Sequence, residues 1–409
     1  MNKQRVVMKR NNVRGVMLAP FALTVSAVLS VAPCMVKAAD AGASTAPAPK
    51  AASWADTLAA WGITANGYIA ASYYVSNGYP ANVHQFDVNH DTFQLDQTGF
   101  QVAYQPMTGF GGLVDLMAGE DARILHLAED GHDNTFDVRQ AFIQYATGPL
   151  TVIGGKYVTL AGAEVINPTG NTNFSRSLLF TWAEPLDHTG IRATYALSST
   201  FSVIVGVNNG WNTTSTDYGS KTGEMGIAWT PNKTFSLAAQ SYVGKFGSTV
   251  SGLDGVRSLV DVVGTYNATS ALTFIVNVDW DRQDQATGNN TAAATWYGVA
   301  GYVNYQFNDR WRTSWRTEYL DDRDGFVTTE MATGLPYSAF YSGSTAGQHF
   351  WESTLTFGYD PTKNFELRLV GRYDSSQTNI FLRSQALGET PAELADSLSE
   401  FAVQGVFKF

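Results

Sequence analysis

The stretch Phe401-Ala-Val-Gln-Gly-Val-Phe-Lys-Phe409 decides the fold class of this chain. Its apolar and polar residues alternate with a period of two, the spacing at which the side chains of a β-strand emerge on the same face. The stretch therefore predicts a strand that separates an apolar environment from a wetter one. The apolar face carries Phe401, Val403, Phe407 and Phe409, and the other face carries Ala402, Gln404 and Lys408.

Segments with the same alternation recur from Gly62 to the end of the chain. Their second faces carry Arg, Asn, Asp, Ser and Glu. Lipid outside and water inside a barrel explain this split better than a two-sheet sandwich, whose buried faces would be apolar and whose charges would lie on two separate outer faces. The clearest segments lie within 191–197, 201–207, 272–280, 297–307 and 311–319.

Connections between these segments alternate between short and long. Compact turn compositions such as Pro231-Asn-Lys and Pro361-Thr-Lys alternate with long polar stretches. We therefore predict an all-β fold, a transmembrane antiparallel β-barrel of about 16 strands with short periplasmic turns and long extracellular loops. The segments near 91–104 and 136–146 change phase, which leaves 14 or 18 strands open. The long connections are 76–90, 120–135, 158–187, 209–221, 244–255, 283–294, 322–347 and 375–396.

The N-terminus has the features of a cleaved export signal. A basic region precedes an apolar stretch over 16–31, and Val36-Lys37-Ala38 places small residues where a signal peptidase reads. We expect a signal peptide over 1–38, a flexible periplasmic lead-in over 39–61 and a barrel over 62–409. Cys34 is the only cysteine and leaves with the signal, which excludes disulfides and thiolate metal sites from the mature chain.

Net charge and mean hydropathy further limit the class of protein. Removing residues 1–38 leaves 20 Lys and Arg against 36 Asp and Glu, a net charge of −16, which argues against nucleic acid as a partner. The mean hydropathy is −0.12, and no later segment approaches the roughly 18 apolar residues of a spanning helix. A barrel is compatible with both values because only alternate residues face lipid.

Ordered motifs lie between residues 136 and 212, and they are Gln140–Tyr145, Gly155–Tyr157, Glu164, Asn173–Ser177, Pro185–Gly190 and Asn209–Asn212. Together these motifs resemble the beta-barrel porin-2 (OmpL-like) family of Gram-negative outer-membrane proteins. The resemblance extends over about 62–409. It implies a cell outer membrane location, passive diffusion of small hydrophilic solutes or ions without a cofactor, contact with outer-membrane lipid and lipopolysaccharide, and recognition of Phe407 and Phe409 by the barrel-assembly machinery.

The connection 158–187 is the candidate constriction loop. It is the longest connection and follows the fifth predicted strand, where general porins fold a loop into the lumen. An inward loop would place charge where permeating ions lose hydration, and would set size and charge selectivity. An ordinary extracellular loop remains the alternative. The candidate constriction residues are Glu164, Arg176, Glu184 and Asp187.

Charged residues in the polar phases of the strands are candidate lumen-wall residues. Two basic rows facing an acidic loop would create a transverse field across the constriction. Alternatively, Arg and Glu pair across neighbouring strands and stiffen the wall. The candidates are Arg192, Arg312, Arg316, Glu318, Glu366, Arg368 and Arg372.

Catalytic and metal chemistry have little support in the sequence. It contains no Gly-x-Ser-x-Gly, His-Glu-x-x-His or phosphate-loop motif, so we expect no enzyme activity. The group His84, Asp87, His90 and Asp91 has no metal-site spacing and is interpreted as a solvated acidic loop. The sequence thus favours an outer-membrane porin. A substrate-specific channel and a non-conducting ligand-binding or adhesin barrel are the alternatives.

Overall fold

A computed structural model describes residues 54–78, 84–129, 133–215, 219–245, 255–284, 293–327, 347–383 and 394–409. The predicted signal peptide and residues 39–53 of the lead-in lie outside this part of the chain. The rest of the lead-in contains a short helix, α1 (Trp54–Ala60), directly before the first strand.

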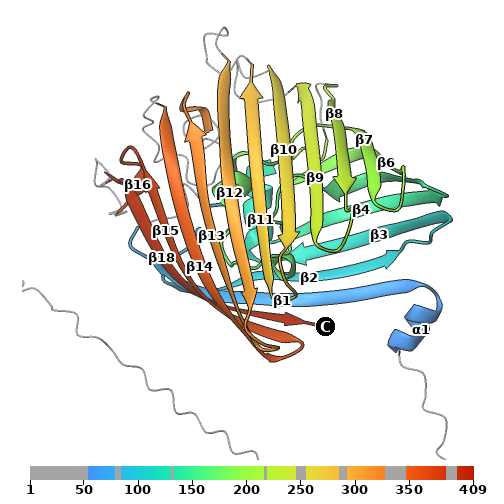
Figure 1. The fold of residues 1–409 in the computed structure, drawn as a ribbon, viewed down its shortest axis with the longest axis horizontal. Coiled ribbons are helices and arrows are strands. Elements are labelled where there is room, and N and C mark those ends of the chain that lie inside the picture. The colour runs from blue at the N-terminus through green and yellow to red at the C-terminus, as the bar shows by residue number, and fades with distance from the viewer. Residues whose placement is uncertain are drawn as a thin grey trace, which may run out of the picture. The chain divides into compact units, whose positions relative to one another are not determined.

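Sixteen antiparallel strands close into a barrel. Figure 1 shows the arrangement of the strands. Each strand pairs with its neighbours in the sequence, and the last barrel strand pairs with the first. The count of 16 is confirmed, as is the alternation of short and long connections. The barrel strands are β1 (Ile63–Ser76), β2 (Thr92–Tyr104), β3 (Gly109–Ala118), β4 (Phe136–Thr147), β5 (Leu150–Val158), β6 (Asp187–Ala196), β7 (Phe201–Asn208), β8 (Thr222–Trp229), β9 (Phe235–Lys245), β10 (Val256–Asn267), β11 (Leu272–Gln283), β12 (Ala294–Gln306), β13 (Trp311–Asp322), β14 (Gln348–Thr362), β15 (Phe365–Ser376) and β18 (Ser397–Lys408).

Few other elements occur among the described residues. None of the described helices is long and apolar enough to cross a membrane. The remaining elements are α2 (Glu120–Glu129), the 3-10 turn η2 (Pro168–Gly170), α3 (Leu178–Trp182) and a two-stranded sheet of β16 (Phe381–Leu382) with β17 (Leu394–Ala395).

The chain closes the barrel with the stretch that predicted the fold. Beyond β18, Phe409 and Gly67 of β1 exchange two backbone hydrogen bonds, each 2.9 Å long. A Cβ atom on Gly67 would lie 2.5 Å from the Phe409 ring, so a larger residue here would displace that ring. The aromatic side chains of Phe401, Phe407 and Phe409 remain exposed on the outside of the barrel.

The two faces of the strands differ as the alternation predicts. Along β11, Val276, Val278 and Trp280 are exposed, while Asn277 and Asp279 between them are buried. An apolar exterior around a polar interior is the arrangement that a lipid surrounding requires.

Two β-bulges explain the phase changes that left the strand count open. Asp96 is the extra residue of β2 opposite β1, and Arg139 is the extra residue of β4 opposite β3. Each bulge shifts the alternation by one position without ending the strand. Both extra side chains are buried inside the barrel.

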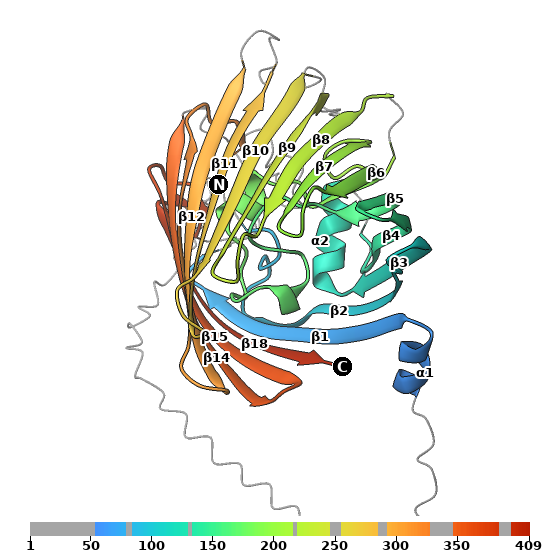
Figure 2. The same cartoon turned by 45° about the vertical axis from the view of Figure 1, so that its right-hand side comes forward.

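Three connections fold into the barrel. Residues 84–90, helix α2 and the segment between β5 and β6 share an apolar cluster that includes Phe86, Leu125 and Phe180. Figure 2 shows α2 enclosed by the strands. The sequence analysis treated 76–90 and 120–135 as extracellular connections. Both are long connections, as predicted, but the described residues 84–90 and α2 fold inward, because their apolar side chains pack against the segment between β5 and β6.

Candidate functional site

The segment 159–186, here called the inner loop, contacts the wall opposite its own strands. It leaves β5 and returns to β6, yet it meets side chains of β13, β14 and β15. The hydroxyls of Thr172 and Ser314 lie 2.9 Å apart, and Thr356 donates a hydrogen bond to Asn173 over 2.8 Å. The inner loop therefore lies within the barrel. Asp187, which the prediction included in the loop, is the first residue of β6.

Arg316 of β13 is the centre of the attachment between loop and wall. Its fully buried guanidinium contacts Glu164 of the inner loop at 2.7 Å and Glu352 of β14 at 3.1 Å. It also donates to the backbone oxygens of Ser175 at 2.9 Å and Arg176 at 3.2 Å. A buried guanidinium requires this many acceptors, because each unpaired donor would cost desolvation energy.

Glu318, two residues further along β13, holds the start of α3. Its carboxylate accepts hydrogen bonds from the backbone N–H groups of Leu178 at 2.8 Å and Leu179 at 3.3 Å. Ser177 caps the same turn by accepting from Phe180 at 3.0 Å. The free N–H groups at the start of a helix are thus satisfied by the barrel wall and by the loop itself.

The other three arginines of the predicted basic rows also bind the inner loop. Arg312 donates to the carbonyl of Thr172 at 2.9 Å, and Arg368 donates to that of Pro168 at 3.1 Å. Arg372 donates to the carbonyl of Arg176 at 2.7 Å. Glu366 lies between two of these arginines and accepts from Arg312 at 2.7 Å and from Arg368 at 2.9 Å. The basic rows are therefore in direct contact with the loop.

Arg176 points into the inner loop. Its guanidinium donates to the carbonyls of Val165, Phe174 and Ile166 at 2.6–3.0 Å, and it lies over the Phe86 ring at 5.3 Å. Burial lowers its pKa, although the surrounding carboxylates oppose this shift. Arg176 thus stabilises the conformation of the inner loop.

The remaining candidate residues lie elsewhere in the barrel. Asp187 is 3.1 Å from Lys156 of β5, and Arg192 of β6 donates to Glu224 of β8 at 2.7 Å. Glu184, at the end of the inner loop, approaches β10 and β11. The structure therefore brings Glu164 together with Arg316 of β13, and pairs neither Glu184 nor Asp187 with the arginines of β13 and β15.

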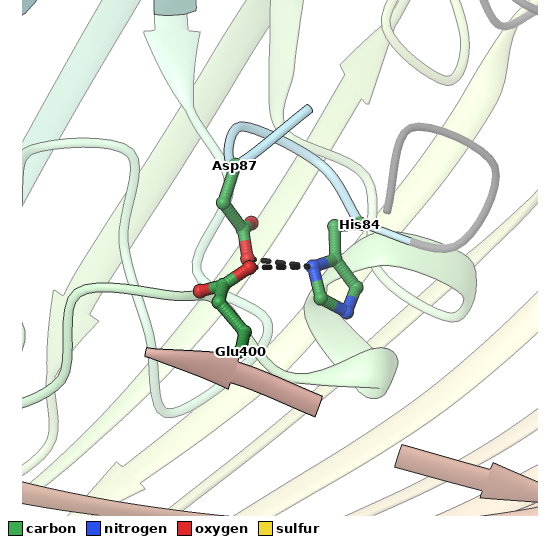
Figure 3. A group of neighbouring side chains, drawn as sticks. All are labelled: His84, Asp87 and Glu400. Carbon is green, nitrogen blue, oxygen red and sulfur yellow. Dashed lines mark ion pairs between the residues drawn. The ribbon is translucent and has the colours of Figure 1, made fainter. Parts of the chain in front are cut away.

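Figure 3 shows a buried group that the sequence analysis interpreted as solvated. His84 is fully buried and lies 2.6 Å from Asp87, 3.2 Å from Asp374 of β15 and 3.7 Å from Glu400 of β18. The solvated interpretation of His84 and Asp87 was wrong, because residues 84–90 fold inward. Nothing in the local sequence could show this, since Asp374 and Glu400 are distant in the chain.

The surroundings of His84 favour its charged form. Burial and the nearby Arg372 oppose protonation, but the carboxylates of Asp87 and Asp374 outweigh them and raise the pKa of His84 to about 9. At neutral pH an imidazolium therefore fastens the segment 84–90 to β15 and β18.

This attachment should weaken at alkaline pH. The folded-state pKa of His84 lies above its ordinary value of about 6.5, so its stabilisation is complete below pH 6.5 and is lost as the pH rises through 9. The loss should be on the order of 3 kcal/mol. Amide hydrogen exchange of residues 84–90, corrected for its intrinsic pH dependence, should rise over this interval.

The matched variants are His84→Gln and His90→Gln. His90 lies in the same segment and pairs with the exposed Asp91. His84→Gln should abolish the additional alkaline exchange, and His90→Gln should retain it. The same pH profile in all three proteins would contradict the assignment to His84.

Comparisons with known proteins agree with this geometry. The family model for beta-barrel porin-2, OmpL-like, matches residues 62–409. Comparison with curated proteins finds no match.

Solved structures with the same fold are outer-membrane proteins. The chain is similar to the outer membrane channel DcaP of Acinetobacter baumannii, with 12% identity, a TM-score of 0.57 and coverage of 85% of this chain and 97% of that one. It is similar to an anion-selective porin from Comamonas acidovorans, with 10% identity, a TM-score of 0.57 and coverage of 85% and 99%. Similarity to OprB of Pseudomonas putida has 14% identity, a TM-score of 0.54 and coverage of 87% and 96%.

These similarities in structure concern the fold alone, and the family match spans the whole barrel. The matched residues form a closed 16-stranded barrel with an apolar exterior. They also include the inner loop, which charged side chains hold to the barrel wall. The chain belongs to the beta-barrel porin-2, OmpL-like family of outer-membrane porins.

Proposed function

We propose that this porin lets small hydrophilic solutes and ions diffuse passively across the outer membrane, past the inner loop. The observation that carries the proposal is the attachment of the inner loop to β13 and β15 through Arg316 and its neighbours. A fixed polar segment within a barrel limits the size of what passes and exposes solutes to oriented charges. No cofactor or energy source enters this mechanism.

Liposome swelling tests passive diffusion. Vesicles that contain the refolded full-length protein should swell in isotonic arabinose, glucose and sucrose at rates that fall as the sugar becomes larger. Vesicles with heat-denatured protein are the control. If vesicles with folded protein swell no faster than this control in any of the sugars, passive diffusion of sugars is excluded.

We further propose that acidic residues near the inner loop give the channel a modest preference for cations. Glu164 and Asp187 are buried beside Arg316 and Lys156, so the variant Glu164→Gln/Asp187→Asn removes negative charge next to these two cations and makes the lumen more positive. The reversal potential in a KCl gradient should shift toward anions, most clearly near 0.01 M salt, where the screening length is about 30 Å. Glu184 should contribute little, because burial raises its pKa well above the usual range.

A charge-matched control separates local from total charge. Asp133→Asn/Asp309→Asn removes the same two charges at exposed positions in connections outside the strands. Its reversal potential should remain that of the wild type. An equal shift in both double variants would mean that Glu164 and Asp187 lie away from the ion path.

For export and assembly, we propose cleavage after Ala38 and recognition of Phe407 and Phe409 by the barrel-assembly machinery, in contact with outer-membrane lipid and lipopolysaccharide. Phe409 also closes β1 against β18 through Gly67. Deleting Phe409 should lower the amount of heat-modifiable, protease-resistant barrel in the membrane. Wild-type yield would show that this residue is dispensable for assembly.

A further inference from the structure

A group of three carboxylates joins the end of the inner loop to β10 and β11, on the side of β12 away from β13. Glu184 belongs to the inner loop, Asp261 to β10 and Asp279 to β11. Asp261 and Asp279 are direct partners in the register of β10 and β11. One oxygen of each of the three side chains lies within 4.8 Å of those of the other two, and all three residues are buried.

No basic side chain of the described residues forms an ion pair with this group. Glu164, by comparison, pairs with Arg316. Asp281, on the same face of β11, adds a fourth buried carboxylate nearby, and Arg257 interacts with that one. Carboxylates at this spacing cannot all be ionised in a buried site without a compensating cation.

Unused acceptor atoms point to the same need. Among the described residues, Glu184 Oε2 and Asp261 Oδ1 have no hydrogen-bond donor, although both atoms are buried. The other oxygen of Asp261 accepts from Asn277 Nδ2 at 2.8 Å, and Asn277 Oδ1 accepts from the backbone of Ala163 at 2.7 Å. Asn277 thus orients Asp261. Buried acceptors without a partner are rare in folded proteins.

We propose that Glu184, Asp261 and Asp279 bind one divalent cation, preferentially Ca²⁺. The donor set is composed of carboxylate oxygens, which suit hard cations, and contains no nitrogen or sulfur ligand that would favour zinc or copper. Ca²⁺ accepts six to eight oxygens in flexible geometry, whereas Mg²⁺ demands a near-ideal octahedron and retains its waters. Three carboxylates from a loop and two strands supply at least three oxygens without such regularity, and water can complete the coordination of Ca²⁺.

The cation would fasten the inner loop to the barrel wall at a second place. The arginines of β13 and β15 hold residues 164–176, and the cation would hold Glu184 against β10 and β11. The buried group His84, Asp87 and Glu400 also has the spacing of a metal site. It is the weaker candidate, because a protonated His84 and Arg372 already neutralise its carboxylates.

Calcium binding to the purified protein tests the proposal. The full-length chain is refolded in detergent from inclusion bodies, since lipopolysaccharide itself binds divalent cations, and is freed of metal with EDTA. Isothermal titration with CaCl₂ should give one Ca²⁺ per barrel, and MgCl₂ should bind more weakly. Loss of an outer partner of a metal ligand already lowers affinity about 10–100-fold, so Glu184→Gln and Asp279→Asn should weaken Ca²⁺ binding at least as much.

Controls make the result specific to this group. Glu184→Gln changes a loop residue and leaves the barrel strands intact, so it tests the site even if Asp279→Asn fails to refold. Glu400→Gln removes a buried carboxylate from the other group and should bind Ca²⁺ like the wild type. The proposal is overturned if the wild type binds no Ca²⁺, or if Glu184→Gln binds it as tightly as the wild type. Neither outcome depends on whether the barrel conducts.

Discussion

Replacing Arg316 by methionine is expected to destabilise the folded barrel by about 3–5 kcal/mol, the usual cost of breaking a buried ion pair on one side. Methionine preserves most of the side-chain volume, so the cost arises from the acids left behind. Glu164 would remain buried without its cation, Glu352 would retain only the longer contact with Arg372, and the carbonyls of Ser175 and Arg176 would lose a donor. Denaturant unfolding in detergent, followed by tryptophan fluorescence, measures the change.

Arg316→Met should also change ion conduction through the barrel. With Arg316 gone, the inner loop loses its central attachment to β13, and single-channel conductance should become larger and noisier. Arg282→Met is the matched control, because Arg282 pairs with Asp284 at the barrel surface and both side chains are more than 40% exposed. A surface pair contributes about 0–1 kcal/mol. Equal losses of stability in the two variants would contradict the assigned role of Arg316.

Replacing Val205 by arginine should destabilise the inserted barrel by about 2–4 kcal/mol, the cost of placing this charge near the middle of the lipid layer. Val205 is 57% exposed on the outer face of β7. Thr194, on the neighbouring strand β6, pairs with the inward-facing Ile204, which is buried. Thr194→Arg therefore carries the same new charge at nearly the same depth on the opposite face, and its cost should be much smaller.

Folding into lipid vesicles, measured by heat modifiability and urea titration, compares the two variants. Equal losses of stability in Val205→Arg and Thr194→Arg would contradict the assignment of the outer and inner faces. A substitution at Asn277 would be a poor control, although Asn277 also lies on the inner face of its strand. Its side chain forms hydrogen bonds with Asp261 and with the backbone of Ala163. An arginine there would disturb the attachment of the inner loop.

The barrel could be predicted from the sequence because its signals are local. Period-two alternation identifies a strand and its two faces within ten or so residues, and turn composition identifies the short connections. The stretch Phe401–Phe409 and the segment Leu272–Trp280 therefore have the predicted orientation. The bulges at Asp96 and Arg139 could be noticed only as phase changes, since an extra residue becomes visible only when the partner strand is known.

The interior could be predicted only in part. The length and position of the connection after the fifth strand indicated an inward loop, and its charge indicated partners on the wall. The inward folding of residues 84–90 and of α2 could not be predicted, because it depends on packing between apolar side chains that are far apart in the sequence. The burial of His84 between β15 and β18 and the approach of Glu184 to Asp261 have the same origin.

The most direct test of the account is the single-channel conductance of the refolded full-length protein in a planar lipid bilayer. The account predicts stepwise increases in current as barrels insert, with a conductance that is ohmic at low voltage and needs no cofactor. Heat modifiability of the same preparation confirms that the barrel is folded. A folded, inserted protein that gives no current steps would contradict the account and would favour a barrel that binds a ligand or partner without conducting.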